Sequence, residues 1–287
     1  MSVSILLSAG LGNQFFMIFA GISYALDNNK KFSILSKMNK TTNGTSTYWD
    51  SIFDKLKEYV NENYEEIDKD SIYNEPTFEY TPIIVSKNKN IVLSGYFQSE
   101  KYFRYNFETI LNILELRKKQ QQIYDQYISL FKSNKTIALH FRFGDYLALQ
   151  NLHCVKTPDY YVIACLEMQK ELKKRGDNIK EYKILYFVQK GYQHYVNEYL
   201  KIICDNTELE LNNFVKISDN MEDWRQMLMM SCCNHFIIAN SSFSWFGAYL
   251  CKNEDKIVCW PKIWFGTANS SKNLKDICPE SWIPIQK

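Results

Sequence analysis

The sequence predicts an α/β protein of two domains, or one bilobal unit, built on parallel sheets. Three observations predict this class. The chain has 287 residues, more than one minimal core needs and too few for three domains. Its first residues read as a strand, a glycine turn and a helix. From residue 136 onward, short apolar segments alternate with segments of helical length, which is typical of a parallel sheet covered on both faces.

Composition indicates a folded protein with no strong overall charge. Apolar residues make up 46% of the chain and aromatic residues 15%, enough to fill buried cores. Lys and Arg (34) nearly balance Asp and Glu (32), so no global field attracts nucleic acid or acidic lipid, and we expect neither as a partner. The eight cysteines contain no C-x-x-C spacing and read as buried thiols. No apolar run reaches the length of a membrane span, and Met1 to Leu7 lacks a basic segment, so we expect a cytoplasmic protein.

The first strand is expected at Val3 to Leu7, followed by a glycine turn from Gly10 to Gln14. The helix after the turn is indicated by the apolar spacing of Phe15, Phe19, Ile22 and Leu26. A dinucleotide fingerprint is disfavoured because its third glycine position falls on Phe15. Two interpretations of the turn remain open. Main-chain N–H groups at Gly12 and Asn13 bind a phosphate or sugar hydroxyl, or the turn is simply tight, with Asn13 as the helix cap.

Five further strands and one amphipathic helix are expected in the second half of the chain. The strands are Thr136 to His140, Lys183 to Val188, Phe214 to Ile217, His235 to Ala239 and Lys256 to Trp260, and the helix carries Tyr161, Ala164, Met168 and Leu172 as its apolar stripe. The region from Asn39 to Pro82 has weak periodicity and predicts loops and short helices. Its acidic run, Glu62 to Asp70, is interpreted as a solvated face.

Unusual polar residues follow two of the predicted strands, where ligands bind in parallel sheets. In the loop from His140 to Asp145, Arg142 is suited to bidentate contact with a diphosphate, Gly144 permits close approach, and Asp145 can hold the guanidinium. The alternative is an Arg142–Asp145 ion pair that only closes the loop. The other strand is followed by an amide and three hydroxyls, at Asn240, Ser241, Ser242 and Ser244, which either cap a helix or bind phosphate oxygens.

Taken together, these blocks resemble glycosyltransferase family 11, the α-1,2-fucosyltransferase family. The resemblance runs through nearly the whole chain. It rests on Gly10 to Phe16, Gly95 to Phe103, His140 to Tyr146, Pro158 to Tyr161, His235 to Ala248 and Pro261 to Phe265.

The resemblance implies a GT-B-like fold, with two Rossmann-like lobes and the active site in the cleft between them. Residues 1–133 would form the acceptor-side lobe and residues 134–287 the nucleotide-sugar-binding lobe, with the last residues packing back on the first lobe. It also implies an inverting transfer of L-fucose from GDP-β-L-fucose to the 2-hydroxyl of a galactoside, without a metal or other cofactor. The Asp-x-Asp sequence at Asp68 to Asp70 lies in the weakly patterned region, which agrees with metal independence.

Site residues follow from the same resemblance. Arg142 matches the diphosphate-binding arginine of the family, and Ser241, Ser242, Ser244 and Asn13 are its candidate helpers. The expected nucleotide-sugar site is completed by His140, Asn240, Gly12 and Gln189. Asp145 and His140 are expected near the reaction centre, but the base that deprotonates the acceptor hydroxyl is not assigned. Aromatic residues of the Gly95 to Phe103 block are candidates for stacking on acceptor sugars, with core packing of Tyr96, Phe97 and Phe103 as the alternative.

Two positions depart from the family pattern. Phe143 stands where a second arginine is usual, and Val188 to Tyr192 carries no acid where a carboxylate is expected to read guanine. A second hypothesis therefore keeps the fold and changes the donor to another nucleotide-deoxysugar, linked to UDP or dTDP. A third hypothesis is a catalytically weak protein that binds glycans or nucleotides.

Overall fold

The computed structural model describes residues 1–62, 68–84 and 90–286. The chain forms two compact units. Unit 1 comprises Met1–Lys119 and Lys272–Pro279, and unit 2 comprises Gln120–Ser271 and Glu280–Lys287. Each unit contains a parallel sheet with helices, so the predicted α/β class with two Rossmann-like lobes is confirmed. The expected cleft concerns the placement of one unit against the other and stays a prediction.

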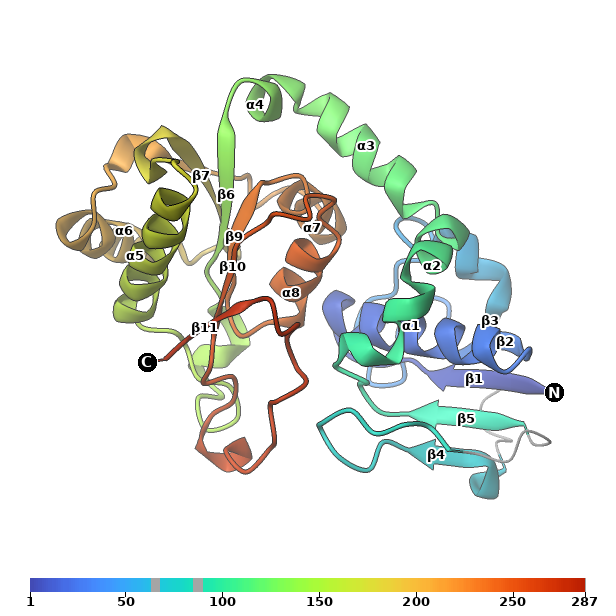
Figure 1. Ribbon diagram of the computed structural model, residues 1–287. Helices are drawn as coiled ribbons and strands as arrows, with labels where there is room; N and C mark the ends of the chain where they lie inside the picture. The colour runs from blue at the N-terminus through green and yellow to red at the C-terminus, as the bar shows by residue number, and fades with distance from the viewer. Residues whose placement is uncertain (63–67, 85–89, 287) are drawn as a thin grey trace. The chain divides into compact units, whose positions relative to one another are not determined.

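Unit 1 is built on a five-stranded sheet with the order β3-β2-β1-β5-β4, in which every pairing is parallel. Figure 1 shows β1, β5 and β4 side by side and pointing the same way. The strands are β1 (Ser2–Leu6), β2 (Lys31–Leu35), β3 (Val60–Asn61), β4 (Ile72–Asn74) and β5 (Ile91–Ser94). The helical segments are α1 (Leu11–Asp27), η1 (Asp54–Tyr59), η2 (Lys69–Ser71), η3 (Glu100–Tyr102), η4 (Arg104–Asn106) and α2 (Phe107–Ile113).

Helix α1 packs closely on strand β1, as the apolar spacing predicts. Phe15, Phe19 and Ile22 are buried, whereas Leu26 near the helix end is exposed. The helix approaches the strand at Gly21, where an added Cβ would lie 2.3 Å from Cγ2 of Ile5. A side chain at this position would push the helix off the sheet.

The weakly patterned region of unit 1 contains more sheet than the sequence indicates. Strands β3 and β4 lie between residues 39 and 82, where only loops and short helices were expected. They have two and three residues, too short to show a period. The acidic run was predicted to be a solvated face; residues 63–67 of it lie outside the described residues, and Asp68 and Asp70 are exposed.

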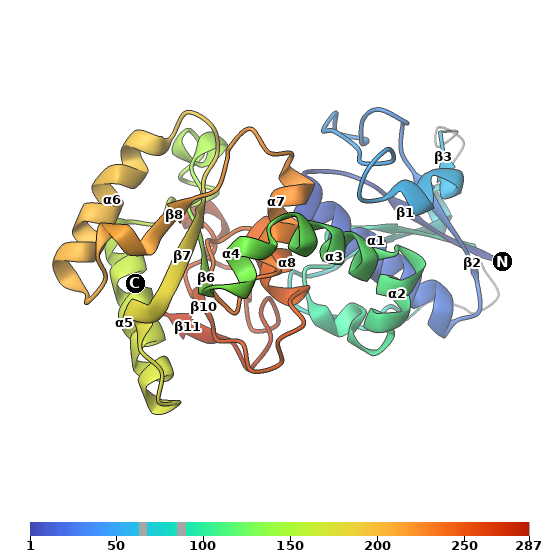
Figure 2. The same cartoon turned by 90° about the horizontal axis from the view of Figure 1, so that it is seen from above.

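Unit 2 is built on a six-stranded sheet with the order β11-β10-β9-β6-β7-β8, again entirely parallel. Helices α5 and α6 cover one face and α7 and α8 the other (Figure 1 and Figure 2). The strands are β6 (Lys135–His140), β7 (Tyr182–Phe187), β8 (Phe214–Lys216), β9 (His235–Ile237), β10 (Val258–Pro261) and β11 (Ile283–Ile285). The helical segments are α4 (Ile128–Lys132), η5 (Gly144–Leu147), α5 (Pro158–Lys174), η6 (Ile179–Glu181), α6 (Gln193–Asn206), η7 (Leu211–Asn213), α7 (Asp223–Met230), α8 (Ser242–Tyr249) and η8 (Thr267–Asn269).

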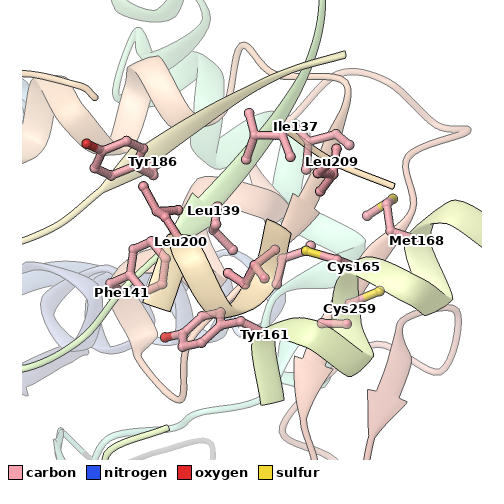
Figure 3. Close-up of a cluster of buried hydrophobic side chains, with 14 of the residues drawn as sticks. Ile137, Leu139, Phe141, Tyr161, Cys165, Met168, Tyr186, Leu200, Leu209 and Cys259 are labelled. Carbon is pink, nitrogen blue, oxygen red and sulfur yellow. The ribbon is translucent and has the colours of Figure 1, made fainter. Parts of the chain in front are cut away.

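The core of unit 2 fills the space between the sheet and helices α5 and α6. Figure 3 shows Ile137 and Leu139 of β6 facing side chains of both helices, among them Met168 and Leu200. The predicted stripe of α5 is buried throughout, at Tyr161, Ala164, Met168 and Leu172. All five strands predicted in this half are present, with ends that differ by at most two residues. A sheet buried on both faces accounts for their continuous apolar sequences.

The division between the units falls inside helix α3 (Leu116–Gln126). Lys119 bonds to Asp54 in unit 1, at 2.6 Å, whereas Gln120 donates to the hydroxyl of Ser231 in unit 2, at 2.8 Å. The expected boundary, between residues 133 and 134, was placed where the sequence pattern changes. The pattern does not change within helix α3, so the sequence gives no sign of the division there. The chain also returns to unit 1 with Lys272–Pro279, while its last residues, Glu280–Lys287, belong to unit 2. The roles assigned to the two lobes stay predictions.

The cysteines of the chain are free thiols, and five of the eight are buried. This agrees with the prediction of buried thiols in place of disulfides. Among the residues described, no helix combines the length and the apolar character that crossing a membrane requires.

A buried histidine lies at the amino end of β9. The ring of His235 accepts the N–H of Ile257 on Nδ1 at 3.0 Å, and its Nε2 lies 3.3 Å from the hydroxyl of Tyr182, which donates to Asp177 at 2.7 Å. Burial, assisted by Arg175, lowers the pKa of His235 to about 4. The neutral imidazole is therefore the form that fits the fold.

We expect acid to destabilise the fold through His235. Its folded-state pKa of about 4 lies below the ordinary value of 6.5, so the unfolded chain binds more protons between these values and stability falls as pH decreases through this window. Lowering pH from 7 to 5 should remove about 2 kcal/mol through this residue. Urea unfolding at both pH values measures the loss. His235→Gln should reduce this loss and exposed His194→Gln should not; equal pH dependence in the two variants would contradict the assignment.

Candidate functional site

The predicted polar residues of unit 2 gather at the carboxyl ends of three adjacent strands. Strand β6 lies between β9 and β7, with Leu139 opposite Ile237 and His140 opposite Phe187. The loops that follow these strands therefore start at one edge of the sheet. They carry His140 to Asp145 after β6, Gln189 after β7, and Asn240 to Ser244 after β9. This is the edge at which open parallel sheets bind ligands.

His140 is the last residue of β6 and is almost completely buried, with 6% of its surface exposed. Its ring lies 5.4 Å from that of Phe243, and its carbonyl accepts the hydroxyl of Tyr161 at 3.1 Å. Burial, followed by the charge of Arg142, lowers the pKa of His140 to about 3. The imidazole is therefore neutral at physiological pH, and its Nδ1 has no hydrogen-bond partner among the described residues.

Arg142 forms the ion pair with Asp145 that was one of its two predicted roles. Nη2 lies 2.5 Å from Oδ1 of Asp145, and the guanidinium carbon sits 4.8 Å from the ring centre of Tyr146. These contacts fix the plane of the guanidinium. Its Nε is buried and lacks a hydrogen-bond partner within the described part of the chain. An oriented cation with an unused buried donor is suited to bind an anionic oxygen.

Gln189 holds the main chain of the Arg142 loop. Its Oε1 accepts the N–H of Phe143 at 2.9 Å, and its side chain packs against Gly144, where an added Cβ would lie 2.8 Å from Nε2. Gly144 has a φ of +60°, a conformation that favours glycine. Gln189 was predicted as a nucleotide contact. That role stays a prediction, because the structure shows only its bond to the loop.

Phe143 is fully buried in a cluster of aromatic rings. Its ring stacks with Tyr192 at 5.9 Å and Tyr195 at 5.3 Å, with interplanar angles of 22° and 26°. The ring of Phe141 is also stacked with that of Phe143, at 6.5 Å. Packing therefore determines the environment of this position, and the side chain that replaces the usual second arginine brings no charge to the edge.

Asn240 joins three segments of unit 2 at the end of β9. Its amide nitrogen donates to the carbonyls of Cys154 at 2.9 Å and Trp264 at 2.8 Å, and its own carbonyl accepts the hydroxyl of Tyr146 at 3.0 Å. Its Oδ1 is buried and has no partner among the described residues. Asn240 thus shapes the site, and one acceptor remains available for a ligand.

The serines after Asn240 differ in their surroundings. Ser241 occupies the cap position of α8 but makes no side-chain cap hydrogen bond, and Ser242 is half-buried in the first turn. Ser244 is completely buried, with its hydroxyl near the carbonyls of Ala239 and Ser241 at 3.4 and 3.3 Å. Because the Ser244 hydroxyl is buried and donates to main-chain carbonyls just before α8, Ser241 and Ser242 are the better candidates for phosphate contact.

Cys154 and Lys156, which lie next to the site, carried no signal in the sequence. Lys156 is buried and donates to the carbonyl of Ile263 at 2.6 Å and to the sulfur of Cys154 at 2.9 Å. Cys154 and Lys156 lie in an irregular segment without a motif. Tyr146, in contrast, was part of the recognised loop, and burial raises its pKa so that its hydroxyl stays a donor.

The candidate residues of unit 1 lie at the carboxyl end of β1. Helix α1 begins after Gly10, which occupies the cap position and has no side chain that could cap the helix. Asn13 is therefore not the cap, because it lies within the first turn, where its Oδ1 accepts Nε2 of Gln98 at 2.6 Å. Gly12 is buried in the same turn. The proposed roles of Gly12 and Asn13 in donor binding stay predictions.

The aromatic residues of the Gly95 to Phe103 block divide into two classes. Phe97 and Phe103 are fully buried, which confirms the core-packing alternative for both, whereas 41% of Tyr96 is exposed. In the described residues, no group of three or more His, Cys, Asp or Glu side chains is arranged to hold a metal ion. Asp68 instead accepts the N–H of Asp70 at 3.0 Å. Metal independence stays a prediction.

Comparison with known proteins shows the family. The model of the family described as glycosyl transferase family 11 matches residues 30–286. The chain belongs to glycosyltransferase family 11. Two relatives from Escherichia coli are similar to this family member. An α-1,2-colitosyltransferase is 26% identical over 208 residues, covering 70% of this chain and 65% of the relative. The O-antigen biosynthesis glycosyltransferase WbnK is 30% identical over 205 residues, covering 67% and 60%. The chain thus spans less than two thirds of the length of either relative.

Solved structures with similar folds include two fucosyltransferases. A mutant of Arabidopsis thaliana FUT1 in complex with GDP has a TM-score of 0.46 at 11% identity, over 97% of this chain and 75% of that chain. NodZ α-1,6-fucosyltransferase co-crystallized with GDP has a TM-score of 0.45 at 12% identity, over 87% and 92%.

We expect Gly144→Ala to disturb the Arg142 loop more than its backbone conformation alone explains. The substitution forces alanine into a left-handed conformation, which costs roughly 1–2 kcal/mol of stability. Its Cβ also displaces Gln189 from the N–H of Phe143. Gly176→Ala is the matched control, because Gly176 also has a positive φ but open space around it. Urea unfolding of both variants measures the loss of stability. Equal losses in the two variants would count against the role of Gln189.

Proposed function

We propose that this member of family 11 is an inverting, metal-independent glycosyltransferase that moves L-fucose from GDP-β-L-fucose to the 2-hydroxyl of a galactoside on a glycan. The observation that carries the proposal is the set of unused polar atoms at one sheet edge. Nε of Arg142, Nδ1 of His140 and Oδ1 of Asn240 are all buried and lack partners among the described residues. Buried polar groups need hydrogen bonds, so an edge with three unused ones is suited to a polar ligand.

The mechanism follows from where charge develops. As the bond between the sugar and the diphosphate lengthens, negative charge grows on the β-phosphate and the sugar becomes oxocarbenium-like. A fixed cation aimed at that phosphate stabilises the transition state more than the ground state. Asp145 and the ring of Tyr146 hold the Arg142 guanidinium in place, so little reorganisation is needed during the reaction.

The other residues are proposed to bind and orient the donor. His140 has a pKa of about 3, which makes it a weak proton acceptor and favours a hydrogen-bonding role over general-base catalysis. Asp145 is engaged by Arg142. Ser241, Ser242 and Asn13 are proposed phosphate contacts, and Gly12 and Gln189 are proposed to line the donor site. The free thiols suit a reducing compartment, which supports a cytoplasmic location.

A second candidate is transfer from another nucleotide-deoxysugar, linked to UDP or dTDP. It is favoured by Phe143, an apolar residue within an aromatic stack, and by the segment Val188 to Tyr192, which contains no carboxylate to pair with guanine. One relative is named for transferring colitose and not fucose, in an α-1,2 linkage. This supports a change of donor sugar within one reaction type.

Replacing Arg142 should abolish most of the turnover. Arg142→Ala removes the proposed charge stabilisation and should lower kcat by roughly 10²–10³. Arg142→Lys should recover only part of it, because an ammonium cannot reproduce the planar fork. The assay is fucose transfer from GDP-fucose to lactose, with Arg175→Ala, at the opposite end of the sheet, as the control. Turnover of Arg142→Ala within a few-fold of wild type would eliminate the proposed role.

The donor base should be identified by binding of GDP, UDP and dTDP to the wild-type protein. Thermal shift and saturation-transfer NMR measure this directly. Clear selectivity for GDP, with fucose transfer, supports the first proposal and removes the second. Comparable binding of all three, or preference for UDP or dTDP, supports the second. Nucleotide binding without sugar transfer from GDP-fucose or from a UDP- or dTDP-linked deoxysugar identifies a protein that only binds.

A further inference from the structure

One exposed aromatic residue in unit 1 is held by an unusual local structure. Tyr96 lies in the turn after β5, at the carboxyl edge of the sheet, between the ends of β1 and β4. The two residues that flank it both have left-handed backbone conformations, with φ of +156° at Gly95 and +52° at Phe97. A left-handed conformation is unfavourable for phenylalanine and persists only where surrounding contacts impose it.

A carboxylate in the segment that follows the neighbouring strand holds this turn. Oε2 of Glu75, which follows β4, accepts the N–H of Tyr96 at 2.8 Å and that of Phe97 at 3.0 Å. An added Cβ at Gly95 would lie 2.4 Å from Cβ of Glu75, so only glycine fits. Burial raises the pKa of Glu75, which reflects the cost of withdrawing a carboxylate from water.

Core packing explains Phe97 and leaves Tyr96 unexplained. Phe97 is fully buried, and its ring packs edge-on against Tyr102 at 5.2 Å. The Tyr96 ring is directed to the surface, 41% exposed, and has no ring or hydrogen-bond partner in the part of the chain that the structure describes. The strained turn and the buried carboxylate therefore fix the main chain at an exposed tyrosine.

We infer that Tyr96 is a platform on which a pyranose ring of the acceptor stacks, and that Glu75 is the positioning residue for it; this inference rests on the proposed function. A galactoside presents an apolar C–H face that packs on an aromatic ring, and hydroxyls at its edge. Amide groups that suit those hydroxyls are near in the chain. Gln98, two residues after Tyr96, bonds to Asn13 at the start of α1.

The direct test is titration of lactose into the GDP-loaded protein, followed by saturation-transfer NMR. Tyr96→Ala should weaken lactose binding roughly tenfold, and Tyr96→Phe, which keeps the ring, should stay within about threefold of wild type. In transfer assays, Tyr96→Ala should raise the KM for lactose with little change in kcat. The control is Tyr105→Ala, since Tyr105 is also an exposed tyrosine of unit 1, 84% exposed, on a different segment.

The role of Glu75 is tested by two substitutions of different severity. Glu75→Gln retains an oxygen that accepts both N–H groups, and should keep the KM for lactose within about threefold of wild type. Glu75→Ala removes the acceptor and should raise that KM as much as Tyr96→Ala does. GDP binding, which involves none of these atoms in the proposed function, should be unchanged and verifies that each variant is folded.

Distinct results contradict the inference and the proposed function. Lactose binding by Tyr96→Ala equal to that of wild type, or no lactose binding by wild type, would overturn the inference. Absence of fucose transfer by the wild-type protein, with lactose binding still dependent on Tyr96, would overturn the proposed donor and leave the platform intact.

Discussion

Burial of β6 on both faces is the constraint on which unit 2 depends. The strand lies in the interior of the sheet, between β7 and β9, and its side chains from Thr136 to His140 are withdrawn from water. With both faces covered by helices, the strand can present polar chemistry only where it ends. After Leu139, polar residues alternate with buried aromatic residues, from His140 to Phe143, where the strand leaves the core.

Three side chains of the candidate site each carry a polar atom that has no hydrogen-bond partner among the described residues. Asn240 uses its nitrogen and its main-chain carbonyl to join three segments, yet its side-chain oxygen is left over. Likewise, Nη2 of Arg142 pairs with Asp145, whereas its Nε has no partner among the described residues. In each of these two side chains, one polar group is held by a contact while another has no partner within the described part of the chain.

Sequence reasoning succeeded where the signal was local and periodic. The strands of unit 2 and the stripe of α5 were predicted because each buried surface recurs at a fixed spacing. It failed where a role depends on a distant partner. Asn13 was considered as a cap, but its partner is Gln98, and nothing in the sequence ties Gln189 to the N–H of Phe143.

The strands of unit 1 set a second limit. β3 and β4 are too short to show alternation, and the left-handed turn at Gly95 and Phe97 depends on Glu75 in a neighbouring segment. The sequence motif identified Tyr96, Phe97 and Phe103 as one aromatic block. Only the difference in their burial separates the exposed ring from the two core residues.

The path of the chain between the units has a consequence for synthesis on the ribosome. Asp276 returns to unit 1, where it pairs with Lys101 and accepts the N–H of Tyr80, and the last strand, β11, then completes the sheet of unit 2. Unit 1 lacks the contacts of Asp276, and unit 2 lacks strand β11, until residues 276–285 have been synthesised. A chain that stops before residue 276 is therefore expected to lose contacts in both units.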